Sequence, residues 1–187
     1  AETPSLPLPL ELYGHRRNSR GADLACLAQL EPLRRAVASA RVEAIAEADP
    51  ARIDAAMARL QAAAAAWNGL GVTARAATLR RAADALEARM AEFCGLLVEE
   101  ARKTLGDCVA EVREAVDFLR YYADEAEARF AAQAPGDPAG EGAEPRLLGR
   151  GVFVCISPWN FPLAIFAGQV VAALVAGNTV AAKPAEQ

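Results

Sequence analysis

The chain has 187 residues, of which 53% are hydrophobic, and its formal net charge is −4. This length allows one well-formed core with an appendage, and the mild acidity argues against the clustered basic surface of a nucleic-acid-binding protein. The longest strongly apolar run, Phe161 to Ala176, is shorter than the ~20 residues of a membrane span, and no signal peptide is visible. We expect a cytoplasmic protein, with no nucleic-acid or membrane binding by this segment.

Cysteine and histidine usage restricts the chemistry. The four cysteines (Cys26, Cys94, Cys108 and Cys155) are scattered with no CxxC spacing, which predicts reduced thiols and no disulfide framework. Three of them, Cys94, Cys108 and Cys155, fall in helix or strand patterns, where a thiol is usually a small buried apolar group. The only histidine, His15, lies in a linker-like segment. We therefore predict no metal site, no Ser-His-Asp triad and no Cys-His pair.

Residues 1–22 have the composition of an interdomain linker, proline-rich at first and then polar. Their short basic cluster, Arg16, Arg17 and Arg20, is interpreted as solvated linker or as a contact that docks one domain on another. A phosphate clamp is the less favoured interpretation, because the cluster follows a proline-rich terminus.

Residues 23–48 are predicted to form a linking helix region. Asp23 could cap a helix whose leucines recur at helical spacing up to Val37. Pro32 falls inside that pattern and lacks the N–H that a helix interior needs, so it predicts a kink or a break.

Residues 49–145 are predicted to be mainly helical. Asp49-Pro50 is typical of a helix start, and that helix should end near Gly69 and Gly71. Thr73 opens the next helical pattern. A long amphipathic helix then follows Gly106-Asp107 and reaches about residue 130, with the "EVRE" stretch (111–114) on a polar face in water. The turn-rich stretch 135–145 should break regular structure.

Residues 146–187 change to a strand, helix, strand pattern. Val152–Ile156 is β-branched and apolar, residues 162–177 form a helix that is apolar nearly all round, and residues 179–184 form a second short strand. This is one βαβ unit, and it predicts a parallel sheet and an α/β fold. Two strands cannot cover such a sheet, so we expect the front portion of a larger α/β enzyme.

The βαβ unit lacks both common phosphate-binding signatures, GxGxxG and GxxxxGK[ST], between its first strand and its helix. Glu186 does follow the second strand, where doubly wound dinucleotide folds often place an acid against ribose hydroxyls, and Lys183 could donate to the same ribose. On spacing alone, a solvated lysine and glutamate at a strand exit is the favoured interpretation.

The turn "SPWNFP" (157–162) separates the first strand from its helix. An asparagine here could donate N–H groups to an oxyanion that develops on an attacked carbonyl. The alternative is that Asn160 caps a helix beginning at Phe161 or Pro162. Local pattern alone favours the cap.

The stretch from Gly151 to Gln187 contains three linked motifs, P-W-N-[FY]-P, A-L-x-A-G-N and K-P-[AS]-E-x. In this order and spacing they resemble the aldehyde dehydrogenase superfamily. The preceding helices are similar to those before the nucleotide domain of that family. The segment "LPLPLELYGHRRNSRGADL" (6–24) resembles the lead into the glutamate semialdehyde dehydrogenase module of the bifunctional proline utilization A (PutA) enzymes. The resemblance covers nearly the whole chain but only about the first third of such a module.

The resemblance implies a helical N-terminal region followed by the first βαβ of a Rossmann-like sheet, and it implies residue roles. Asn160 would be the catalytic side-chain donor to the oxyanion. Residues beside the turn and at the second strand's end would bind NAD: Ile156, Ser157, Pro158, Trp159, Asn160, Lys183, Pro184, Ala185 and Glu186. Phe161 and Glu114 would face the aldehyde. An acid near the ribose, Glu186, favours NAD over NADP.

The implied activity is NAD-dependent oxidation of L-glutamate γ-semialdehyde to L-glutamate in proline catabolism. FAD is expected only in a proline dehydrogenase module that this chain lacks. The family's catalytic cysteine and general-base glutamate lie downstream of Gln187, and none of the four cysteines matches the catalytic motif. The expected partners are a small aldehyde, the remainder of a parent polypeptide and further copies in a homo-oligomer. The alternatives are another semialdehyde dehydrogenase or a non-catalytic helical interaction fragment.

Overall fold

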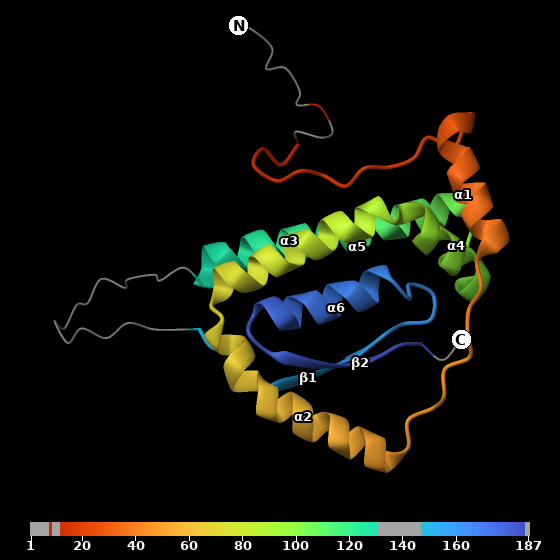
Figure 1. Ribbon diagram of the computed structural model, residues 1–187. Helices are drawn as coiled ribbons and strands as arrows, with labels where there is room; N and C mark the ends of the chain where they lie inside the picture. The colour runs from red at the N-terminus through yellow and green to blue at the C-terminus, as the bar shows by residue number, and fades with distance from the viewer. Residues whose placement is uncertain (1–7, 9–11, 131–146, 186–187) are drawn as a thin grey trace, which may run out of the picture.

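The computed structural model describes residues 8, 12–130 and 147–185, as six helices and two strands. Figure 1 shows their arrangement along the chain. The elements are α1 (Leu27–Ser39), α2 (Pro50–Gly69), α3 (Val72–Ala88), α4 (Met90–Ala101), α5 (Leu105–Phe130), β1 (Val152–Ile156), α6 (Ala164–Val175) and β2 (Thr179–Lys183). The predicted break at 135–145 lies outside the described residues.

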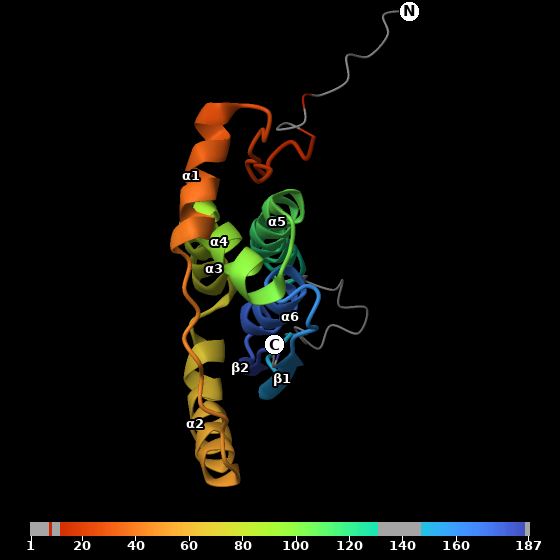
Figure 2. The ribbon, with the colours of Figure 1, turned by 90° about the vertical axis from the view of Figure 1, so that its right-hand side faces the viewer.

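The two strands and α6 form the predicted βαβ unit. β1 pairs with β2 in parallel, from Val152 opposite Thr179 to Ile156 opposite Lys183. The helix α6 covers one face of this sheet and α2 contacts the other, so the strands lie between two helical layers (Figures 1 and 2). The α/β architecture predicted from the sequence is confirmed.

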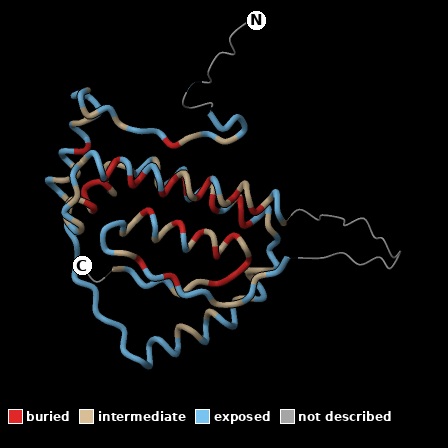
Figure 3. Tube along the Cα trace, turned by 180° about the vertical axis from the view of Figure 1, so that it is seen from behind, coloured by how far each residue is buried: buried red, intermediate tan, exposed pale blue. Residues whose placement is uncertain are grey.

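The buried residues form two clusters that share the long helix α5, and Figure 3 marks buried positions along the chain in red. One cluster joins α3, α5 and α6, and the other joins α1, α4 and α5. α6 is less enclosed than its composition predicts, because Ile165 and Gln169 are exposed on one side. The core therefore holds α6 directly against α5, and this contact positions the turn that precedes α6.

The start of α2 agrees with the sequence, whereas α1 does not. Asp49 caps α2 by accepting a hydrogen bond from the Arg52 backbone N–H at 2.7 Å. Asp23 instead closes a short turn before α1, and the helix begins only at Leu27. The predicted break at Pro32 is absent, since α1 runs through it.

Packing on α4 explains why α1 persists despite its proline. Leu33 is buried in the shared cluster with α4. At Gly95 on α4, a Cβ atom would lie 2.8 Å from the Ala36 carbonyl oxygen, so glycine allows the two backbones to approach closely. This tertiary contact outweighs the one hydrogen bond that Pro32 removes.

The segment that precedes α1 is held on α3 and α5 by polar contacts. Arg17 pairs with Glu87, and Ser19 donates to Asp117 through both its backbone N–H and its hydroxyl, each at 2.8 Å. Arg120 also binds Glu87. Burial alone would raise the pKa of Glu87, but the hydrogen bonds from Arg120 and from the Arg20 backbone lower it overall. Arg17 and the Arg20 backbone N–H thus attach this segment to α3 through Glu87, so the basic cluster is not solvated linker throughout.

Candidate functional site

The turn between β1 and α6 lies at the carboxyl end of the parallel strands, where open α/β sheets bind ligands. The Ser157 backbone N–H extends the strand ladder by donating to the Lys183 carbonyl at 2.9 Å. Ser157 is 7% exposed, and its hydroxyl donates to the Pro158 carbonyl at 3.1 Å. The turn therefore begins from a backbone position fixed against the neighbouring strand.

Asn160 is exposed at this turn. Its side-chain amide makes no hydrogen bond to any other residue that the structure describes, while its backbone carbonyl accepts one from Lys103 Nζ at 3.0 Å. The prediction that Asn160 caps α6 is wrong, because α6 begins at Ala164 with Leu163 in the cap position. The two N–H donors of the Asn160 amide are thus left available at the ligand-binding edge of the sheet.

Glu111 of α5 supplies the cap that the sequence assigned to Asn160. Its Oε1 accepts hydrogen bonds from the backbone N–H groups of Leu163 at 2.8 Å and Ala164 at 3.2 Å. Its Oε2 pairs with Lys103 Nζ, and the Glu111 side chain is completely buried. The ammonium of Lys103 also lies 4.2 Å from the centre of the Phe161 ring.

This network was missed by the sequence analysis, which placed the "EVRE" stretch (111–114) on a water-facing side of the helix. That placement is wrong for Glu111. The residue lies one helical turn from Cys108 and from Ala115, both buried. A carboxylate inside a buried helical stripe was the available signal, because such a group needs hydrogen-bonding or charged partners.

The Glu111 carboxylate lies at the helix terminus that carries a glycine-rich fingerprint in many nucleotide folds. In many nucleotide folds the N–H groups that open this helix bind a phosphate. Here Glu111 already accepts from two of them. Two of the N–H groups at the start of α6 are therefore already used by a carboxylate of the protein itself.

The residues expected at the cofactor differ in exposure. Ile156 and Trp159 are 57% and 66% exposed, Lys183 and Pro184 are exposed, and Pro158 and Ala185 are partly buried. A shallow hollow brings the turn and the second strand's end together; it is lined by Glu100, Ala101, Trp159, Pro162, Phe166, Pro184 and Ala185. Glu186 lies outside the described residues.

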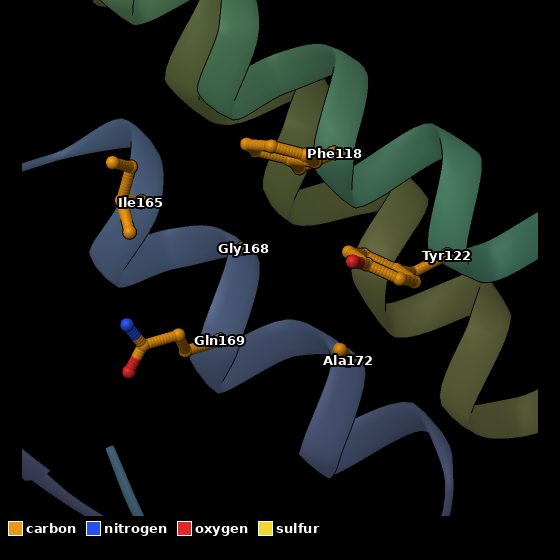
Figure 4. Close-up of a pocket in the computed structure, with 6 residues that line it drawn as sticks. All are labelled: Phe118, Tyr122, Ile165, Gly168, Gln169 and Ala172. Atoms are coloured by element: carbon orange, nitrogen blue, oxygen red, sulfur yellow. The ribbon is translucent and has the colours of Figure 1, made fainter. Parts of the chain in front are cut away.

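The two residues expected at the substrate are separate from the apolar groove between α5 and α6. Glu114 is exposed on α5, and Phe161 is 36% exposed on the turn. Figure 4 shows the groove, which is lined by Phe118, Tyr122, Ile165, Gly168, Gln169 and Ala172. Neither predicted residue is in that lining.

Three cysteines are buried in surroundings that disfavour the thiolate. Burial raises the pKa of Cys94 to about 12 and that of Cys108 to about 11, and it also raises the pKa of Cys155. A catalytic cysteine needs the opposite shift, so these three thiols lack the activation expected of a catalytic nucleophile. Within the described residues, no cluster of three or more His, Cys, Asp or Glu side chains could hold a metal ion. None of the described helices is long and apolar enough to span a membrane.

Comparison with known proteins gives consistent relatives. The chain is 40% identical over 216 aligned residues to the bifunctional protein PutA of Escherichia coli K12, covering 98% of this chain and 16% of that protein. It matches a crystal structure of bifunctional proline utilization A at a TM-score of 0.91 and 48% identity, over 98% of this chain and 19% of that one. A 1-pyrroline-5-carboxylate dehydrogenase from Thermus with bound NAD matches at a TM-score of 0.81 and 29% identity, over 91% of this chain and 40% of that one.

The chain therefore spans less than half the length of each of these relatives. The family model that describes the aldehyde dehydrogenase family matches residues 29–187, which include all of the helices from α2 onward and both strands. The P-W-N-F-P turn and the parallel strand ends lie within this match. On this evidence the chain belongs to the aldehyde dehydrogenase family.

Proposed function

We propose that these residues are the front part of an NAD-dependent aldehyde dehydrogenase that oxidises L-glutamate γ-semialdehyde to L-glutamate. The main observation is the exposed side-chain amide of Asn160 at the carboxyl end of β1, on a turn whose backbone is held from both sides. The PutA and 1-pyrroline-5-carboxylate dehydrogenase relatives support the choice of aldehyde.

The activity belongs to a longer polypeptide, which supplies the groups that these residues lack. Three apolar side chains of β1 remain open to solvent, with Phe153 at 42%, Val154 at 61% and Ile156 at 57% exposure. Further strands of the sheet would cover such a surface. The remainder of the parent would also provide the catalytic cysteine and the general-base glutamate, and, in a bifunctional enzyme, a separate FAD-containing proline dehydrogenase module.

Asn160 acts on the oxygen of the aldehyde. When a cysteine thiolate adds to the carbonyl carbon, the carbonyl oxygen gains negative charge, and the Asn160 N–H groups donate hydrogen bonds to it. Such a donor stabilises the transition state more than the ground state, because the charge is larger there. Phe161 and Glu114 would contact the aldehyde side chain.

NAD, when bound, supplies the acceptor for the hydride that leaves the aldehyde carbon. The strand ends fit its adenosine ribose: Lys183 is exposed at the end of β2, beside Pro184 and Ala185. Glu186 would accept from the ribose hydroxyls, which favours NAD over NADP. The pyrophosphate would not bind the Leu163 and Ala164 N–H groups, since Glu111 already accepts from both.

The test is Asn160→Ala in the complete polypeptide, assayed by NADH formation from L-glutamate γ-semialdehyde. We expect kcat to fall on the order of 10²–10³-fold, as when other enzymes lose one oxyanion donor. Gln169→Ala, which removes an exposed amide from α6, is the matched control and should leave kcat unchanged. An Asn160→Ala enzyme with normal kcat would exclude the oxyanion role.

The substrate is tested separately with a panel of semialdehydes. A higher kcat/KM for glutamate semialdehyde than for succinate semialdehyde or simple aldehydes is expected. Equal values across the panel would show a general semialdehyde dehydrogenase, and no NADH from any aldehyde would favour a non-catalytic role.

A further inference from the structure

We propose that the buried Lys103–Glu111 pair is a positioning device for Asn160, which fixes the backbone of the 160–164 turn so that the amide meets the oxyanion. The inference rests on the proposed function, because it assigns to Lys103 and Glu111 a role in that reaction. Both residues act through Asn160 and touch neither substrate nor cofactor.

Glu111 holds the far side of the turn. One carboxylate oxygen, Oε1, accepts from two consecutive backbone N–H groups, those of Leu163 and Ala164. A negative charge at this position is also favoured by the partial positive charge at the start of α6. Because α5 is packed in both core clusters, Glu111 ties the beginning of α6 to the helix that these clusters share.

Lys103 holds the near side of the same turn. Lys103 belongs to the short link between α4 and α5. Its ammonium pairs with Glu111 Oε2 and donates to the Asn160 carbonyl at 3.0 Å. It also faces the Phe161 ring at 4.2 Å, in the range of a cation–π contact. One ammonium therefore contacts the residue that provides the oxyanion donor and the residue that follows it.

The arrangement suits positioning better than stability. Burying two charges costs free energy that their attraction repays only partly, so a buried ion pair is weak evidence for a stabilising role. The Lys103 side chain is 13% exposed and that of Glu111 is 0% exposed. The pair instead fixes the Asn160 carbonyl and the Leu163 and Ala164 N–H groups, and it makes no bond to the Asn160 amide. A donor held this way needs little reorganisation when the oxyanion forms.

The first experiment compares two adjacent ion pairs in the complete polypeptide. Lys103→Met removes the contacts to Asn160 and Phe161, and Glu111→Gln keeps an acceptor for the α6 N–H groups while it removes the charge that binds Lys103. We expect kcat to fall on the order of 10- to 100-fold with KM nearly unchanged, the cost of a small misplacement. Arg102→Met and Glu99→Gln are the controls, because Arg102 pairs with Glu99 on the surface and its side chain is 76% exposed.

The second experiment separates positioning from general damage. In an Asn160→Ala background, Lys103→Met should lower kcat no further than about twofold, because the donor that it positions is already gone. A merely structural role predicts that the full loss recurs in that background. The proposal is overturned by such a recurrence, or by a Lys103→Met enzyme with normal kcat.

The third measurement does not depend on catalysis. Amide hydrogen exchange of the peptide covering residues 160–166 should be faster in Lys103→Met and Glu111→Gln than in the wild type, and unchanged in Arg102→Met. Unchanged exchange in all variants would overturn the proposal. An inactive wild-type polypeptide, in contrast, would refute the proposed function, and exchange would then show whether the pair still fixes the turn.

Discussion

The helix α6 has an asparagine close to each end, and the two are used in opposite ways. Asn178 follows the C-terminus and is 4% exposed; its Oδ1 accepts from the backbone of Arg150 at 2.6 Å and Gly151 at 3.2 Å, and its Nδ2 donates to the Ala173 carbonyl at 3.1 Å. Asn160 precedes the N-terminus and is exposed, and within the described residues only its backbone is held.

The difference separates an amide that is bonded within the fold from one that is open to solvent, as the proposed oxyanion donor must be. The Asn178 Oδ1 joins the residues before β1 to the end of α6, its Nδ2 donates back to α6, and the side chain is buried away from any ligand. Near Asn160, Lys103 binds the Asn160 carbonyl and Glu111 binds the Leu163 and Ala164 N–H groups, while the Asn160 amide makes no bond within the described residues. A side-chain donor is both well positioned and available to a ligand when the main chain around it is fixed and the side chain itself is unpaired.

The largest effect on stability is expected from Asn178→Ala. Loss of Oδ1 leaves the partly buried Arg150 and Gly151 N–H groups without their acceptor, and the two lost hydrogen bonds together cost about 3 kcal/mol of unfolding free energy. Urea unfolding of the complete polypeptide measures the shift, and kcat of the folded fraction should remain normal.

The control is the same substitution at the other end of α6. Asn160→Ala should change the unfolding free energy by less than about 0.5 kcal/mol, as for an exposed position, while it lowers kcat. Equal destabilisation by the two variants would mean that the Asn160 amide has a structural partner after all, and the contrast between the two asparagines would fail.

A smaller loss of unfolding free energy is expected from Gly177→Ala. Gly177 ends α6 with φ at +94° in a Schellman motif, in which its N–H donates to Leu174 and that of Asn178 donates to Ala173. An added Cβ would lie 2.3 Å from Asn68 Oδ1, which accepts from the Gly149 N–H, so Asn68 must move as well. Backbone strain and the disturbed bond together cost about 2 kcal/mol of unfolding free energy.

Gly14→Ala is the matched control, because Gly14 has φ at +61° and nothing within 4 Å of an added Cβ. Gly14→Ala should lose about 1 kcal/mol of unfolding free energy from the unfavourable backbone conformation alone. Gly177→Ala should lose more than this in the same urea titration. If both variants lose the same amount, the contact with Asn68 adds nothing to the C-terminal end of α6.

The elements around α6 were predictable because local pattern determines them. Asp49-Pro50, the apolar strand 152–156 and Gly177-Asn178 each combine a propensity with a specific backbone need, and all three lie where the sequence placed them. The cap of α6 and the continuity of α1 through Pro32 were not predictable in this way. Both depend on residues far away in the chain, 52 positions for the bond from Leu163 to Glu111, and no local spacing encodes such a partner.

A smaller effect than that of Gly177→Ala is expected from Trp67→Phe, which weakens the C-terminal end of α6 without exposing a polar group. Trp67 Nε1 donates to the Leu174 carbonyl at 2.8 Å, and that carbonyl also accepts from the Gly177 N–H at 3.0 Å, so it stays satisfied after the substitution. The net loss should be about 1 kcal/mol of unfolding free energy, the usual value of one hydrogen bond, and kcat should not change. A fall in kcat comparable to that of Lys103→Met would show that the two ends of α6 are coupled through the helix. The urea midpoint and kcat are measured on the same preparation. A lower midpoint with unchanged kcat would support the proposal that the C-terminal end of α6 stabilises the fold, whereas the N-terminal end positions Asn160.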